Sequence, residues 1–298
     1  MAQSFLNTGT QQGNFEDLAN FIITVNYKRT SFLSKLGTAK AKGIKHEWMT
    51  QALKAGAANA RAEGYVPSFA AGNTTARVRR NNQVQLLALP LSVSGTQNAV
   101  DKAGIGQRSE YDYQKGLKYE ELALDCDYEL INNTLVTRDG DAGTAGEFDG
   151  ILNWATGLNA NNGLLTEDIF NQLCNTLADA GGDPDIVWCN GFQKRAITGW
   201  ATPIRRAELE AETYKNKVMV YDGDWGQQSI VWNKHVPTAQ IVVAETKYLK
   251  AAYLRPVQHI KLGVNGDVDE GLVLSELTLE VQAPQTVGKI TSLATAGA

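Results

Sequence analysis

A long polar stretch without a regular apolar pattern separates two strand-like segments in the first third of the chain. Residues 44–50 and 84–93 have strand-like sequences, whereas the stretch from Lys54 to Asn82 is rich in Ala, Gly, Asn and Arg. Such a stretch cannot form a core of its own, and a loop of this length is uncommon inside a compact domain. We therefore predict a two-stranded excursion, with 44–50 as the outgoing arm and 84–93 as the return arm, which projects from the body and is ordered by a partner. Pro90 in the return arm indicates an edge position or a bulge, because proline cannot donate to a sheet ladder.

The strongest helical pattern follows at residues 107–137. Five side chains fall on one stripe at helical spacing: Leu117, Leu124, Tyr128, Ile131 and Leu135. Ser109 can cap the first turn, where the helix dipole favours the acids Glu110 and Asp112. At about 1.5 Å per residue this helix would be a rod of roughly 45 Å, far longer than an average globular helix.

The second half of the chain predicts an α+β fold. We expect short helices and strands in alternation, at residues 166–180, 186–189, 191–200, 217–221 and 228–232. Residues 273–282 alternate apolar and polar side chains, which is the pattern of a half-buried strand. The length of 298 residues fits two domains.

Charge is unevenly distributed along the chain. In total 28 Lys and Arg stand against 32 Asp and Glu, and the net charge of −4 excludes a strongly basic nucleic-acid-binding protein. The excursion at 43–97 has a net charge of +4, and the predicted rod at 107–137 has a net charge of −4. These opposite charges favour attraction within one chain or between copies, and a solvated mixed surface is the alternative.

We expect the excursion of one copy to lie over the rod of the next. The basic side chains proposed for this contact are Lys54, Arg61, Arg77, Arg79 and Arg80. The acidic side chains proposed for it are Glu120, Glu121, Asp125, Asp127 and Glu129. Ion pairs at a rim are worth only about 0.2–1 kcal/mol each, so they would set register while buried apolar area supplies most of the affinity.

The sequence lacks the motifs of an enzyme or a metal protein. It contains no GxGxxG, GxxxxGK[ST] or GxSxG pattern, and His46-Glu47 is followed by Thr50 where a zinc hydrolase needs a second His. The segments 222–224 and 265–270 resemble fragments of calcium loops but lack the Glu at the twelfth position. Cys126, Cys174 and Cys189 form no CxxC pair. We therefore expect no enzymatic activity, no cofactor and no metal, and the short apolar runs exclude a transmembrane helix.

The order of these parts resembles the major capsid proteins of tailed bacteriophages, which have the Hong Kong 97 fold. The resemblance is strongest to the branch of SU-ten-type major head proteins. The pieces that carry it are residues 45–48, 59–64, 80–84, 93–97, 115–127, 140–144, 150–152, 254–256 and 276–281. Each piece is weakly specific, but their order holds over residues 20–290.

The resemblance implies a division of the chain and a function. The parts would be an N-terminal arm (1–42), an extended β-hairpin loop (43–97), a peripheral domain with the spine helix (98–150), an axial domain (151–239) and returning peripheral strands (240–298). The protein would self-assemble through hexamers and pentamers into the icosahedral head shell around the double-stranded DNA genome. Scaffolding protein, portal and decoration protein would be further partners, with assembly in the bacterial host cytoplasm.

The resemblance also implies a weak, sequence-independent contact with the packaged DNA. The expected lining is the basic end of the arm, with Lys28, Arg29, Lys35, Lys40 and Lys42. The shell protein of a cellular, encapsulin-like nanocompartment is the alternative, since it shares the fold and also self-assembles. A nucleotide-binding enzyme built on residues 165–200 would need a phosphate-binding loop, which the sequence lacks.

Overall fold

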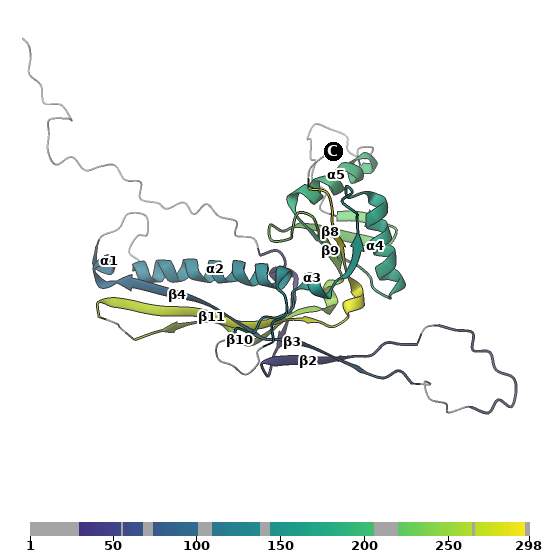
Figure 1. Cartoon of the computed structure of the whole chain (residues 1–298), viewed down its shortest axis with the longest axis horizontal. Coiled ribbons are helices and arrows are strands. Elements are labelled where there is room, and N and C mark those ends of the chain that lie inside the picture. Colours follow the sequence, from purple (N-terminus) through teal and green to yellow (C-terminus); the bar gives the residue numbers. More distant parts are fainter. Residues whose placement is uncertain are drawn as a thin grey trace, which may run out of the picture.

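The computed structural model describes residues 30–54, 56–67, 74–100, 109–137, 144–205, 220–263 and 266–295. It confirms the mixed α+β composition predicted from the sequence. Figure 1 shows an elongated lobe, a compact lobe beside one end of it, and a hairpin that projects away from both. Apart from the longer elements described below, the structure contains the short helices η1 (Leu33–Lys35), α1 (Gly95–Ala99), α3 (Ile151–Trp154), η2 (Thr246–Tyr248) and η3 (Pro284–Thr286).

The elongated lobe consists of a four-stranded sheet and one long helix. The strand order is β1 (Gly37–Lys40), β10 (Leu249–Lys261), β11 (Val268–Val281) and β4 (Gln85–Ser94). Strand β1 pairs with β10 in parallel, and the other two pairings are antiparallel. Strand β4 is an edge strand, which confirms the edge position predicted from Pro90.

Helix α2 (Glu110–Asn132) packs against β4 and β11 along this lobe. The Ser109 hydroxyl accepts the Asp112 backbone N–H at 3.2 Å, which confirms the predicted cap. The 23 described residues give a rod of about 34 Å. The predicted continuation to residue 137 is wrong, because Asn133 is already extended and Val136 forms a β-bridge with Glu147.

The buried stripe of α2 also differs from the predicted one. The buried apolar side chains of its second half are Leu122, Cys126, Leu130 and Ile131. Of the predicted stripe, Ile131 is buried as expected, and Leu117 and Leu124 are half-buried. Tyr128 is 50% and Leu135 39% exposed. The prediction selected about one large apolar residue per turn. The sheet instead covers the neighbouring face of α2, on which the small Cys126 lies between Leu122 and Leu130.

The compact lobe is built on a six-stranded sheet. Its strand order is β5 (Thr156–Asn159), β12 (Val287–Thr291), β9 (Ile241–Ala244), β6 (Ile186–Cys189), β8 (Gly226–Trp232) and β7 (Val220–Gly223). Helices α4 (Glu167–Asp179) and α5 (Gly191–Arg205) flank this sheet (Figure 1). All four residues of β6 and of β9 are buried, so these strands form the centre of the core. The predicted strand at 217–221 is confirmed only from Val220, since 206–219 lie outside the described residues.

The projecting hairpin pairs β2 (Lys45–Thr50) with β3 (Val78–Gln83), in the register Lys45↔Gln83 to Thr50↔Val78. The predicted return arm 84–93 is therefore wrong as the partner of 44–50. That segment is β4, whose alternate residues are buried under α2. Burial against the helix outweighs continuation of the hairpin, because the segment 78–83 offers hardly any apolar surface to the core.

Among the described residues no helix is long and apolar enough to span a membrane. Within the same residues no three His, Cys, Asp or Glu side chains are grouped so that they could hold a metal ion.

Candidate functional site: a projecting hairpin and the groove at its base

The loop beyond the hairpin leaves apolar side chains in water. All described residues in 51–54, 56–67 and 74–80 are exposed. Leu53 is 95%, Val66 82% and Tyr65 52% exposed. Burying such side chains stabilises a protein by about 25 cal/mol per Å² of apolar surface, and this subunit leaves that gain unused. Exposed apolar side chains of this kind are typical of a surface that contacts another chain.

The base of the hairpin is fixed to the body through β2. His46 Nε2 lies 2.9 Å from Glu280 Oε2, and both side chains are largely buried. The Trp48 indole N–H donates to the Val281 carbonyl oxygen at 3.0 Å. The Trp48 ring also packs against Trp154, with ring centroids 5.7 Å apart. These contacts hold the alternate residues of β2 against the end of β11.

A second anchor comes from β3. The Asn82 side chain is fully buried; its Nδ2 donates to the carbonyl oxygens of Leu279 at 2.8 Å and Asp149 at 3.1 Å. Its Oδ1 accepts the Asp149 N–H at 2.8 Å. Because both strands are tied down, the direction of the hairpin is set before any partner binds, and this lowers the entropic cost of binding.

Asn82 and Glu280 were missed by sequence reasoning. For β2 the sequence did carry a signal, since the buried side alternates with the charged residues Lys45 and Glu47. For Asn82 no signal existed, because Asn81 beside it has the same chemistry and is not buried.

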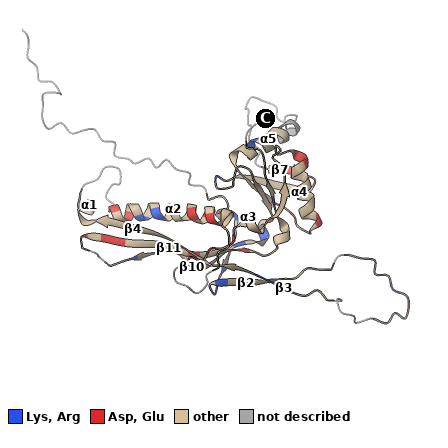
Figure 2. Cartoon of the chain, viewed as in Figure 1, with Lys and Arg blue, Asp and Glu red and all other residues tan. Residues whose placement is uncertain are grey.

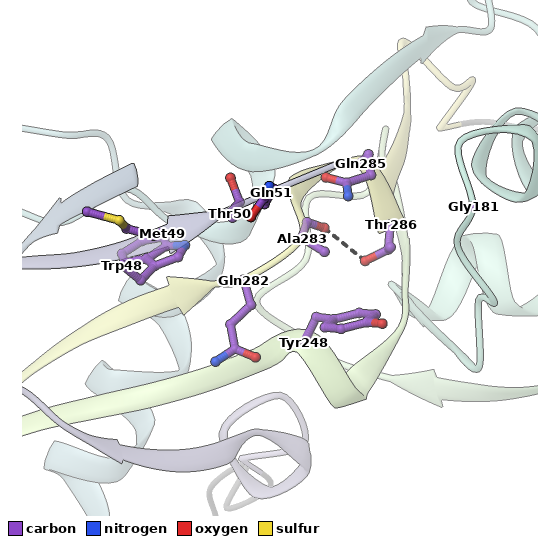
Figure 3. Close-up of a pocket in the computed structure, with 10 residues that line it drawn as sticks. All are labelled: Trp48, Met49, Thr50, Gln51, Gly181, Tyr248, Gln282, Ala283, Gln285 and Thr286. Atoms are coloured by element: carbon purple, nitrogen blue, oxygen red, sulfur yellow. Dashed lines mark hydrogen bonds between the residues drawn. The ribbon is translucent and has the colours of Figure 1, made fainter. Parts of the chain in front are cut away.

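A groove of about 400 Å³ opens where β2 meets the body. Trp48, Tyr248, Gln282 and Gln285 line it together with six other residues, and none of the ten is charged (Figure 3). The groove therefore offers amide, hydroxyl and aromatic surface, and its lining contains no carboxylate, imidazole, amine or thiol.

All five basic residues proposed for the inter-subunit contact are exposed. Arg79 lies 3.6 Å from Glu47 on the neighbouring strand, and the Arg61 guanidinium lies 4.9 Å from the centre of the Tyr65 ring. Within the described ranges, neither Arg77 nor Arg80 has an acidic partner within salt-bridge distance. At Arg77 and Arg80 the loop thus presents positive charge that no acid of the described residues pairs.

The acidic residues proposed for the contact lie on α2, and Glu120, Glu121 and Asp125 are exposed. Glu121 is paired with Lys118 at 2.6 Å. Partial burial, together with the nearby Glu121, raises the pKa of Asp125. Partial burial also raises the pKa of Glu129. A cation near these acids would lower their raised pKa values, because it favours the charged carboxylates.

Asp127 is not available for such a contact, and this part of the expectation is wrong. Its side chain is 0% exposed and accepts hydrogen bonds inside the subunit. The charge pattern alone could not reveal this, because Asp127 lies only two residues from the exposed Asp125.

The structure does not bring the two charged sets together within one subunit. The hairpin loop and α2 extend in opposite directions from the middle of the molecule (Figure 1), and acidic residues occur toward both ends of α2 (Figure 2). Any pairing between them must therefore join two copies.

Of the residues proposed to face the genome, Lys35, Lys40 and Lys42 are exposed at the start of the described chain. Lys28 and Arg29 lie outside the described residues.

The three thiols are poor nucleophiles. Burial raises the pKa of Cys126 to about 12, that of Cys174 to about 11 and that of Cys189 to about 12. Thiolate is therefore negligible at neutral pH, and all three cysteines are buried.

An elongated helix–sheet lobe, a compact lobe and a pre-aimed hairpin with unburied apolar side chains together define a shell-forming protein of the Hong Kong 97 capsid fold. The family model described as SU10 major capsid protein matches residues 4–294. The chain belongs to this family, and it is a major capsid protein of the tailed-phage kind, as the sequence predicted.

Solved structures of capsids share the fold. The capsid of cyanophage A-1(L) matches with a TM-score of 0.73 at 10% identity, over 98% of this chain and 100% of that one. A structure of Gordonia phage Cozz matches with a TM-score of 0.66 at 16% identity, over 97% of this chain and 94% of that one. The SrpI encapsulin complex of Synechococcus elongatus PCC 7942 matches with a TM-score of 0.63 at 13% identity, over 94% of both chains. No curated protein matches the chain.

Proposed function

We propose that this capsid protein assembles through hexamers and pentamers into an icosahedral head shell around double-stranded DNA. In this proposal residues 1–42 are the arm, 43–97 the extended loop, 98–150 and 240–298 the peripheral domain, and 151–239 the axial domain. Three strands depart from this division, because β4 belongs to the sheet of the elongated lobe, and β9 and β12 belong to the sheet of the compact lobe. The observation that carries it is the exposure of Leu53 and Val66, at 95% and 82%, on a hairpin that is anchored at its base. In this proposal a neighbouring subunit buries these side chains.

In the assembled shell the loop lies over the spine-helix region of the next subunit. Apolar side chains on the elongated lobe are available to receive Leu53 and Val66: Leu86 and Val257 are each 45%, Leu262 43% and Ile260 38% exposed. Arg77 and Arg80 then come near Glu120, Glu121 and Asp125. Apolar burial supplies the affinity, and the charges select the register.

The burial of the loop is tested with the variant Leu53→Cys. Its thiol should react with a maleimide in unassembled subunits and be protected in shells. The unsubstituted chain is the control: its three buried cysteines should not react until the shell is unfolded in guanidinium. Equal labelling of Leu53→Cys in subunits and shells would contradict the proposed docking.

The arm makes the contact with the genome. Lys28, Arg29, Lys35, Lys40 and Lys42 give it a net positive charge that suits phosphates of any sequence. Protein–DNA crosslinking of filled heads should recover peptides from residues 28–42. Recovery of these residues only by reagents confined to the outer surface would contradict this placement. Scaffolding, portal and decoration proteins are separate partners, and assembly takes place in the host cytoplasm.

An encapsulin-like shell is the second candidate, supported by the likeness to the SrpI encapsulin complex in fold. The two functions differ in what the shell encloses. Particles purified from cells and treated with nuclease should retain double-stranded DNA of uniform length if the chain forms a phage head. A protein cargo without protected DNA would favour the encapsulin-like function instead.

A further inference from the structure

Asp127 lies at the junction of three parts of the subunit. It belongs to α2, its side chain is 0% exposed, and its carboxylate accepts three hydrogen bonds from neutral donors. Oδ1 accepts the backbone N–H groups of Phe32 and Leu33, each at 2.9 Å. Oδ2 accepts the side-chain N–H of Asn233 at 2.7 Å. One carboxylate thus joins the N-terminal segment, the spine helix and the compact lobe.

The N-terminal segment is inserted at this junction, and it does not merely lie on the surface. Phe32 is 0% exposed and packs edge-on against Trp188 of β6, with ring centroids 4.7 Å apart. The Ser31 hydroxyl donates to the Trp232 carbonyl oxygen at 3.1 Å. The chain therefore enters the described structure through a contact with the central strands of the compact lobe.

Asn233 continues the connection into the compact lobe. It is also 0% exposed, and its Oδ1 accepts the His235 backbone N–H at 2.7 Å. Its own backbone N–H donates to the Cys189 carbonyl oxygen at 3.0 Å, at the end of β6. With both ends of its amide engaged, Asn233 cannot flip without losing a bond.

We propose that Asp127 is a positioning residue that fixes where the N-terminal arm leaves the subunit and couples this exit point to the compact lobe. A displacement of the arm then shifts α2 and the compact lobe together, because all three are hydrogen-bonded to one carboxylate. The importance of this coupling for shells rests on the assembly function proposed above. The coupling itself is a property of the single subunit.

The chemistry of the pair suggests a reciprocal exchange. In Asp127→Asn the new amide N–H₂ meets the N–H₂ of Asn233, and in Asn233→Asp two carboxylates meet. In the double variant the amide at 127 donates to the carboxylate at 233. That carboxylate still accepts from His235, and the oxygen at 127 still accepts from Phe32 and Leu33. Charge, volume and hydrogen bonds are all retained, so only the double variant should behave like the native chain.

Hydrogen exchange on capsomers of the full-length protein tests this proposal. Each single variant should raise the rate of backbone amide hydrogen exchange about tenfold in residues 30–36 and 232–236, because each leaves buried donors or acceptors unpaired. Exchange in α4 should not change, since a global loss of stability would raise it as well. Asp222→Asn, the same exchange at an exposed position of β7, is the matched control and should change neither segment.

The double variant decides the outcome. Native protection in both segments supports the proposal. Protection no better than in the single variants, or a single variant that loosens 30–36 without 232–236, overturns it. Shells that form equally well from all variants while the exchange pattern holds would support the coupling within the subunit and show that shell assembly does not depend on it, so the two proposals can fail separately.

Discussion

The central strands of the compact lobe and the strands of the projecting hairpin belong to one chain but meet opposite environments. Strands β6 and β9 are buried at every position. In β3 the residues Val78, Arg79 and Arg80 are all exposed, and only the last three residues reach the body. The sheet of the compact lobe is covered by its own subunit, whereas the described residues of the hairpin loop are exposed, and we propose that a neighbour covers them.

This difference separates folding from assembly. Substitutions in β6 and β9 should reduce the free energy of unfolding of the subunit, and shells are lost as a secondary effect. Substitutions in the hairpin loop should leave the subunit folded and act on shell formation alone. The following predictions test how completely the two properties are separated.

Removal of the loop should have the largest effect. Replacing residues 53–76 by an Asn-Gly turn keeps β2 and β3 paired and retains the anchors His46, Trp48 and Asn82. We expect a folded subunit whose melting temperature changes by less than about 3 °C, together with a complete loss of closed shells. Calorimetry and negative-stain electron microscopy measure the two. Normal shells from this variant would show that the loop is dispensable.

Truncation of one large apolar side chain in each region should give opposite results. Trp188 is 0% exposed, and Trp188→Ala should cost about 3–5 kcal/mol of unfolding free energy by leaving a cavity beside Phe32. Leu53 is 95% exposed, and Leu53→Ala should cost less than about 0.5 kcal/mol while raising the protein concentration needed for assembly. Urea unfolding and light scattering measure these quantities. A destabilised Leu53→Ala subunit would contradict the separation.

Charge reversal in the loop should have a smaller effect on assembly. Arg77→Glu and Arg80→Glu each remove a cation without an acidic partner in the described part of the subunit, at an expected cost of about 0.2–1 kcal/mol per interface. The defect should shrink at high salt, because exposed charges are screened. Glu121→Lys together with Asp125→Lys should restore assembly of the Arg77→Glu, Arg80→Glu chain. Failure of this rescue would mean that the loop docks away from these acids.

The same contrast explains how far the sequence allowed the fold to be predicted. The cap at Ser109, the strand at 186–189 and the helix at 167–179 were predicted correctly, because each depends on local patterns that its own subunit completes. The pairing partner of β2 was predicted wrongly, because the strand-like sequence of β4 is compatible both with pairing to β2 and with its actual position beside β11. Burial under α2, a contact distant in sequence, made the difference.

The candidate site shows a similar limit. The exposure of the loop could be predicted, because it follows from the composition of the loop itself. The burial of Asp127 could not be predicted, because its partners Phe32 and Asn233 lie 95 and 106 residues away in the sequence. Counting charges treats Asp125 and Asp127 alike, and only the tertiary structure distinguishes them.

The smallest expected effect is a pH dependence of the free energy of unfolding. It should arise in the two lobes and not in the hairpin loop. Burial, with the nearby Lys115 and Lys261, lowers the pKa of His259, although Asp112 opposes this shift. His259 Nε2 lies 2.8 Å from the Tyr111 hydroxyl oxygen, within hydrogen-bond distance. Since the folded-state pKa lies below the unfolded value of about 6.5, the unfolded chain binds more protons, and stability should fall as pH drops below 6.5 through the folded-state pKa.

The variant His259→Gln should flatten this dependence in urea titrations between pH 7 and pH 5. The pH at which shells assemble should change little, because the arginines of the loop stay charged over this range. His235, whose pKa is also lowered by burial, should keep part of the slope in the variant. An unchanged slope in His259→Gln would mean that the tip of the elongated lobe does not contribute to acid sensitivity, and that the body loses stability through its other buried groups.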